Sequence, residues 1–120
     1  MTVSLDEFDR AVTALERVLS LPLDDVVRDA SIQRFEFCIE LAWKTARKAM
    51  GTQATAPKQV VREMLQNGLV DATEPWFEAL DMRNLSVHTY NEEVAQEVYR
   101  FAKEFVPEFR VLLSRLRTST

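Results

Sequence analysis

Apolar residues recur at alternating spacings of three and four along most of this chain, and this helical period constrains its fold more than any other feature. Only two glycines and four prolines interrupt 120 residues, so long helices meet few breakers. No segment alternates polar and apolar residues between turn signals, as a strand would. We therefore predict an all-α fold, an antiparallel four-helix up-and-down bundle with an additional short helix.

Signals for helix ends divide the chain into five helices. Ser4 and Glu7 have the spacing of a capping box, and Asn91 is a suitable cap for the last helix. Pro107 is expected to kink or restart that last helix, because its ring removes an amide donor. The expected helices run from about Leu5 to Leu19, from Asp24 or Asp29 to Gly51, from Pro57 to Asn67, from Thr73 to about His88, and from Asn91 onward.

The second helix is more apolar than a surface helix needs to be. Beyond its main stripe it carries Phe37, Leu41 and Trp43, which predicts a central position or a second interface. The expected core stripes of the four long helices are Leu5, Phe8, Val12, Leu15 and Leu19; Ile32, Phe35, Ile39, Ala42 and Ala46; Trp76, Leu80 and Leu85; and Val94, Val98, Phe101, Phe105, Phe109, Leu112 and Leu116.

Composition limits the class of protein. With 47% hydrophobic and 28% charged residues, the sequence is typical of a globular chain, and we expect a single domain over residues 1–120. No apolar run approaches the length of a membrane span, and the first residues reach Asp6 too soon for a signal peptide. The single cysteine, Cys38, is interpreted as a core residue. These features favour a cytoplasmic protein without membrane contact.

Charge is unevenly distributed, although the net charge of −4 offers no general attraction for nucleic acid. The stretch from Leu41 to Arg62 contains five bases and no acid. Its first three bases, Lys44, Arg47 and Lys48, are candidate contacts for phosphate or for a partner protein. Complementing the C-terminus of the second helix is the alternative role for these bases, and both interpretations remain open.

His88 is the only histidine in the chain, and it is the one side chain suited to move protons in both directions near neutral pH. On an ideal helix Asp81, Asn84 and His88 share one stripe, which makes Asp81 and Asn84 candidate orienting residues for the histidine. Arg83 lies about 140° from His88 on the same wheel, so the two share a face only if the last turn unwinds or a second copy supplies one of them. An arginine and a histidine together suit phosphodiester chemistry.

Two acidic residues on the second helix lie one turn apart. Glu36 and Glu40 could act as paired carboxylates, could bind a metal or could orient Arg83 and His88. Alternatively, Glu40 could form an ion pair with Lys44, four residues later. The sequence lacks the second histidine of a transition-metal site and has no phosphate-binding or dinucleotide motif. We therefore expect neither a metal site nor a cofactor.

Two runs of sequence resemble the nucleotidyltransferase substrate-binding protein family, a branch of the HEPN superfamily. The first is Arg34-Phe35-Glu36-Phe37-Cys38-Ile39-Glu40-Leu41-Ala42-Trp43-Lys44, and the second extends from Asp81 to Glu93 with Arg83, His88 and Tyr90 at its centre. The resemblance covers roughly residues 28 to 105. It implies a helical bundle that forms a homodimer and pairs with a small, separate nucleotidyltransferase.

For relatives with the spacing of Arg83, His88 and Tyr90, the resemblance implies a metal-independent ribonuclease in a toxin–antitoxin pair. Arg83 and His88 would then be catalytic, and Tyr90 would accept a nucleotidyl group from the partner. A second interpretation of the family is a non-catalytic subunit that binds a nucleotide or RNA for the nucleotidyltransferase. A purely structural scaffold is a third alternative, and the sequence does not decide between them.

Overall fold

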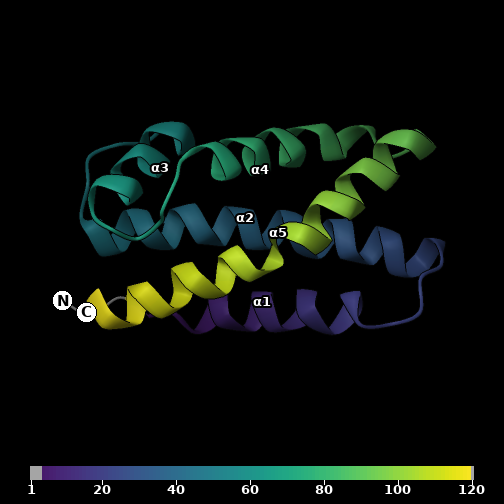
Figure 1. Ribbon diagram of the computed structural model, residues 1–120, viewed down its shortest axis with the longest axis horizontal. Helices are drawn as coiled ribbons and strands as arrows, with labels where there is room; N and C mark the ends of the chain where they lie inside the picture. Colours follow the sequence, from purple (N-terminus) through teal and green to yellow (C-terminus); the bar gives the residue numbers. More distant parts are fainter. Residues whose placement is uncertain (1–3, 120) are drawn as a thin grey trace.

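The computed structural model describes residues 4–119, which fold into helices without a strand. The helices are α1 (Asp6–Leu19), α2 (Asp25–Met50), α3 (Pro57–Gln66), α4 (Glu74–Leu85) and α5 (Glu92–Ser119), with a 3-10 turn, η1 (Ser86–His88), between α4 and α5. Figure 1 shows the long helices side by side along the molecule and the short α3 at one end. The predicted all-α bundle with an additional short helix is confirmed.

The central position of α2 is the main organising feature of the bundle. This helix contacts α1, α3, α4 and α5. Leu41 and Trp43 are half-buried and pack against the core, whereas the side chain of Phe37 remains 46% exposed. A central position therefore accounts for two residues of the second apolar face, and Phe37 is left at the surface.

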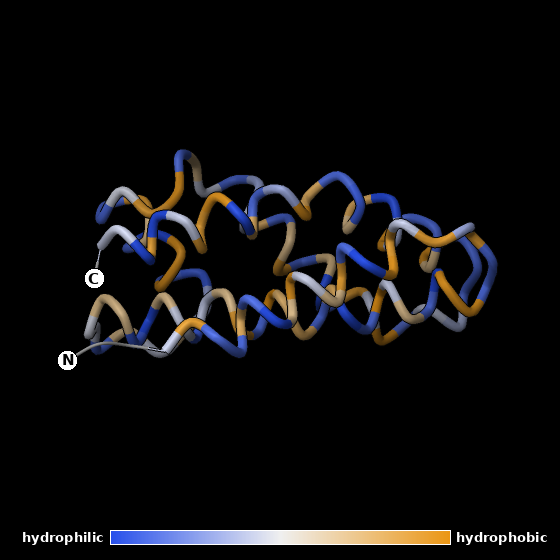
Figure 2. The backbone as a smooth tube through the Cα atoms, turned by 90° about the horizontal axis from the view of Figure 1, so that it is seen from below, coloured by the Kyte–Doolittle hydropathy of each residue, from blue (hydrophilic) through white to orange (hydrophobic). Residues whose placement is uncertain are grey.

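The core is built from the predicted stripes. Every residue of the expected α2 stripe is buried, as are Phe8, Val12 and Leu15 of α1. Aromatic rings from four helices meet in this core, because Phe8 of α1, Phe35 of α2 and Trp76 of α4 all pack against Phe109 of α5. Trp76 also packs edge-on against Phe105, with 4.9 Å between the ring centroids. In Figure 2 apolar and polar stretches alternate along the long helices, as expected of helices with one buried face.

Most helix ends follow the sequence signals, but the start of α1 and the end of α4, which stops at Leu85 rather than near His88 as predicted, do not. Asp24 caps α2 by accepting a hydrogen bond from the Val27 N–H at 2.7 Å, and Gly51 ends it with a φ of 64°. Asn91 caps α5. The capping box at Ser4 is wrong, because α1 begins one residue later than expected and Ser4 Oγ only receives the Asp6 N–H at 3.4 Å.

The last helix runs through its proline without a restart. Pro107 lies inside α5, and the ribbon changes direction near the middle of this helix (Figure 1). Val94 and Phe101, predicted in the core, are only half-buried, whereas Ala95 and Ala102 are fully buried. In the first half of α5, Val98 and Phe105 are buried as predicted, and Ala95 and Ala102 take the core positions expected for Val94 and Phe101.

No helix within residues 4–119 is long and apolar enough to cross a membrane. Residues 1–3, which include the start of the predicted domain, and residue 120 lie outside the described residues.

Candidate functional site

The predicted motif lies where α4 ends, at the end of the bundle opposite α3 (Figure 1). The chain leaves α-helical geometry after Leu85 and continues as the 3-10 turn η1. Buried Ser86 donates its hydroxyl to the Arg83 carbonyl at 2.6 Å, and the Asn91 N–H donates to the His88 carbonyl at 3.0 Å. Local hydrogen bonds therefore define the path of the chain from the arginine to the α5 cap.

His88 and Tyr90 form a pair at the surface. Tyr90 Oη lies 3.4 Å from His88 Nδ1, and the two rings meet edge-on with centroids 5.9 Å apart. Both side chains are exposed, Tyr90 to 86%. A proton-transfer group and a potential acceptor hydroxyl are thus adjacent and open to a large ligand.

Arg83 is held against α2. Its guanidinium forms an ion pair with Glu40 and donates to the Asn84 side-chain oxygen at 3.1 Å. Glu40 also pairs with Lys44 at 3.2 Å, so this carboxylate contacts both of the cations considered for it. The side chain of Arg83 remains 25% exposed.

The three residues predicted to share a polar stripe, Asp81, Asn84 and His88, are all exposed, but Asp81 and Asn84 contact other side chains than His88. Asp81 instead lies 3.7 Å from Lys58 Nζ on α3, and Asn84 accepts its hydrogen bond from Arg83. The 3-10 turn η1 winds more tightly than an α-helix. His88 therefore lies away from the position that an ideal α-helix would give it.

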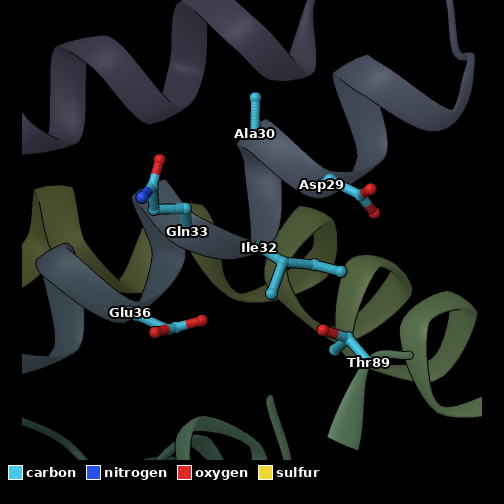
Figure 3. A pocket seen from close by; sticks show the side chains of 6 residues that line it. All are labelled: Asp29, Ala30, Ile32, Gln33, Glu36 and Thr89. Carbon is cyan, nitrogen blue, oxygen red and sulfur yellow. The ribbon is translucent and has the colours of Figure 1, made fainter. Parts of the chain in front are cut away.

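Glu36 lies one turn before Glu40 and lines an open groove of about 400 Å³. The groove extends from the first half of α2 to Thr89, the residue after His88 (Figure 3). In this view the Glu36 carboxylate points toward the side of the groove that holds Ile32 and Thr89. Of the two predicted orienting carboxylates, Glu40 thus contacts Arg83, and Glu36 lines a groove beside Thr89.

The basic segment is partly engaged by the fold. Arg47 Nε donates to the Ala54 carbonyl at 2.6 Å and so holds the connection after α2. Lys44 and Lys48 are exposed, and the Lys44 ammonium also lies 5.7 Å from the centre of the Trp43 ring. These positions leave the binding role of the three bases a prediction.

Sequence reasoning missed the contact that joins α2 to the start of α5, directly after η1. The Arg28 side chain is 12% exposed and donates to Glu92 at 2.5 Å, joining the start of α2 to the start of α5. Glu92 follows directly after the Asn91 cap. No local pattern signals this pair, because its members are separated by 64 residues.

Two further observations concern Cys38 and the possible metal ligands. Cys38 is fully buried, and burial raises the pKa of its thiol to about 12, so it is a core residue as expected. Within residues 4–119, no group of three or more His, Cys, Asp or Glu side chains is arranged to hold a metal ion.

The chain is similar to known proteins over most of its length. Residues 3–118 match the family described as nucleotidyltransferase substrate binding protein like. A protein of Haemophilus influenzae named probable ribonuclease HepT is 33% identical over 103 residues, which cover 79% of this chain and 70% of that protein.

Two solved structures are similar over nearly the whole chain. A crystal structure of a Thermus thermophilus protein has a TM-score of 0.85 and 32% identity, covering 92% of this chain and 98% of that one. A Haemophilus influenzae structure, described as the fold of a substrate binding domain of a nucleotidyltransferase, has a TM-score of 0.84 and 31% identity, covering 95% and 99%. The chain therefore belongs to the nucleotidyltransferase substrate-binding protein family.

Proposed function

We propose that this protein is a metal-independent ribonuclease, with Arg83 and His88 as its catalytic residues, that acts in a toxin–antitoxin pair with a small nucleotidyltransferase. The observation that carries the proposal is the η1 turn, which exposes His88 beside Tyr90 while Arg83 stays anchored to Glu40. A similar protein bears the name probable ribonuclease HepT, which supports the same activity.

The proposed reaction is cleavage of the RNA backbone by its own 2′-hydroxyl. With Nδ1 protonated and donating to the Tyr90 hydroxyl oxygen, Nε2 of His88 is free to accept the 2′-hydroxyl proton. The 2′-oxygen then bonds to phosphorus, and the bond from phosphorus to the 5′-oxygen breaks. The leaving 5′-oxygen takes a proton from water or from an imidazolium, which gives a 2′,3′-cyclic phosphate and a 5′-hydroxyl.

Arg83 would stabilise the charge that develops on the phosphoryl oxygens. Its pair with Glu40 fixes the position of the guanidinium, and the exposed part of this side chain would meet the phosphate. Glu40 is therefore proposed as a positioning residue, because it acts on the reaction only through Arg83. Asn84 would assist in the same way through its hydrogen bond.

The ribonuclease proposal makes a direct kinetic prediction. His88→Ala and Arg83→Ala should each lower the rate of RNA cleavage by roughly 10²- to 10⁴-fold, because they remove the base and the charge stabilisation. Both side chains are outside the core, so circular dichroism should show an unchanged fold. Arg100→Ala is a matched control, since Arg100 is an exposed arginine on α5.

The products and the metal requirement complete this test. Cleavage should leave a cyclic phosphate and should persist in excess chelator. Activity that survives in His88→Ala, or that disappears only when chelator is added, would contradict the proposal.

Tyr90 is proposed as a regulatory acceptor of a nucleotidyl group from the partner enzyme. Its hydroxyl would attack the α-phosphorus of a nucleoside triphosphate, losing its proton while pyrophosphate leaves. The resulting phosphodiester would carry negative charge next to His88 and exclude the substrate phosphate.

Labelling identifies the acceptor residue. With the partner enzyme and a labelled nucleoside triphosphate, peptide mass mapping should find the adduct on Tyr90, and Tyr90→Phe should abolish it. Equal labelling of the Tyr90→Phe variant would instead make Tyr90 a structural residue. Tyr99→Phe is the control, since the chain has only two tyrosines and Tyr99 is buried.

A homodimer is part of the proposed function. The exposed Phe37 on α2 would be covered by a second copy, which could bring a second Arg83 and a second His88 to the same cleft.

Lys44, Arg47 and Lys48 are proposed as contacts for RNA phosphate or for the partner, and reversing their charges should weaken that binding more at low salt than at high salt. The single domain over residues 1–120 and a cytoplasmic location belong to the same proposal.

A non-catalytic subunit that binds nucleotide or RNA for the nucleotidyltransferase is the second candidate. It is favoured by the ion pair of Arg83, which already neutralises much of that cation, and by the description of a similar structure as a substrate binding domain. The isolated protein distinguishes the two candidates. A subunit that only binds would retain RNA without cutting it, and His88→Ala would leave its affinity unchanged.

A further inference from the structure

The groove between α2 and Thr89 has the features of a binding site that the proposed reaction does not use. It has a volume of about 400 Å³ and is lined by Asp29, Ala30, Ile32, Gln33, Glu36 and Thr89 (Figure 3). Thr89 directly follows His88, so a group bound here would lie next to the proposed catalytic residue. This volume is in the range of small-molecule sites and exceeds that of one nucleobase.

Two polar side chains of this groove are without partners. Among residues 4–119, neither the Glu36 carboxylate nor the Gln33 amide makes a hydrogen bond or ion pair, although Glu36 is half-buried. Asp29 differs, because one of its oxygens already accepts from Arg28 at 3.2 Å. The Thr89 hydroxyl donates to the Ser86 carbonyl at 3.0 Å and keeps its lone pairs. The unused groups are thus one carboxylate and one amide, one helical turn apart.

The lining of the groove determines which chemistry fits. No lysine, arginine or histidine lines it, and two carboxylates do, so a phosphate would be repelled. Ile32 and Ala30 add an apolar surface against which a flat ring can lie. A neutral ring that carries hydrogen-bond donors on its edge satisfies both conditions.

We propose that this groove binds a guanine base of the RNA substrate and gives the reaction a base preference, an inference that rests on the proposed action on RNA. The Glu36 carboxylate would accept from guanine N1–H and N2–H, which form two adjacent donors. The Gln33 amide at the rim would donate to O6. An alkylammonium or guanidinium group of a protein would also attract Glu36, but it offers no acceptor for the amide of Gln33.

Binding of free nucleotides tests the groove independently of cleavage. We would titrate the protein with guanosine, inosine, adenosine, cytidine and uridine 5′-monophosphates, which share one phosphate group. Nuclear magnetic resonance would follow the Thr89 backbone amide and the Gln33 side-chain amide. Guanosine monophosphate should bind most tightly, and inosine monophosphate, which lacks the N2 amino group, should bind more weakly.

The variant Glu36→Gln keeps the size of the side chain but presents a donor where guanine needs an acceptor. It should weaken guanosine monophosphate binding by roughly 10- to 100-fold, the usual effect of losing a two-bond contact to a base. Glu36→Ala should weaken it similarly. Glu104→Gln is the control, because Glu104 is an exposed glutamate on α5 and changes the net charge equally.

The outcomes separate this proposal from the ribonuclease proposal. Equal affinity for the five nucleotides, or guanosine binding that is unchanged in Glu36→Gln, would overturn the base site. Binding of arginine amide in the groove without binding of guanosine monophosphate would overturn it as well, in favour of a protein contact. RNA cleavage with no base preference would overturn it while leaving the ribonuclease intact, whereas selective guanosine binding without cleavage would support only the site.

Discussion

Glu40 forms ion pairs with two cations, and its contact with Arg83 determines how that side chain is oriented toward a ligand. The carboxylate pairs with Arg83 from α4 and with Lys44 one turn further along α2. Only the Lys44 pair is local in sequence, and exposed pairs of that kind contribute little to stability, about 0.3–0.5 kcal/mol. The pair with Arg83 crosses between helices and defines where the guanidinium is presented.

The burial of Cys38 predicts how slowly its thiol reacts in the native protein. Its thiol is fully buried, and the raised pKa of about 12 leaves almost no thiolate at neutral pH. Native protein should therefore react with Ellman's reagent far more slowly than protein unfolded in urea, and the readout is simple because the chain has one cysteine. Rapid, stoichiometric labelling of the native protein would show that this part of the core opens readily.

Two contacts, one within α5 and one from α2, hold the backbone that follows η1. Asn91 caps α5, and Arg28 on α2 donates to Glu92 in the first turn of the same helix. These contacts anchor the end of η1 from both sides. The exposed His88–Tyr90 pair is therefore mounted on ordered backbone, which is what a proton-transfer site requires.

The α1–α5 contact predicts how stability depends on pH. Arg110 on α5 donates to Glu16 at 2.6 Å and to Asp9 at 2.9 Å on α1. Hydrogen bonding to Arg110 lowers the pKa of both carboxyls from their ordinary values of 4.5 and 3.8. Because the folded pKa values lie below the unfolded ones, this stabilisation is present above about pH 5 and is lost as the pH falls through the folded values.

Urea denaturation at several pH values checks this prediction. Arg110→Gln should lower the free energy of unfolding at pH 7 by on the order of 1 kcal/mol, since these side chains are more than a third exposed. The difference from the wild type should shrink between pH 5 and pH 2. Arg100→Gln serves as the control, and a difference that is constant over this range would contradict the assignment.

At the scale of the whole molecule, the apolar surface of α2 bears on assembly. Phe37 is 46% exposed on the face of a helix whose other sides contact four helices. We predict that the protein sediments as a dimer at tens of micromolar, and that Phe37→Glu shifts it toward the monomer by placing a charge in the interface. Leu65→Glu is a matched control, since Leu65 is 42% exposed on α3.

Sedimentation equilibrium without the partner enzyme measures this state. A wild-type protein that remains a monomer over the whole concentration range would remove the argument for a site shared between two copies. A dimer that Leu65→Glu disrupts but Phe37→Glu does not would place the interface on another face.

The sequence alone determined the fold class, the number of helices, most of their ends and the α2 core stripe, because periodicity and capping are local properties of the chain. It also pointed to Arg83, His88 and Tyr90, through the resemblance of that run to the nucleotidyltransferase substrate-binding protein family. Only the tertiary structure decided which partner each side chain meets. Asp81 pairs with Lys58, Arg83 with Glu40, and Arg28 with Glu92. These contacts depend on how separate helices pack and on a 3-10 turn, and neither follows from an ideal helical wheel.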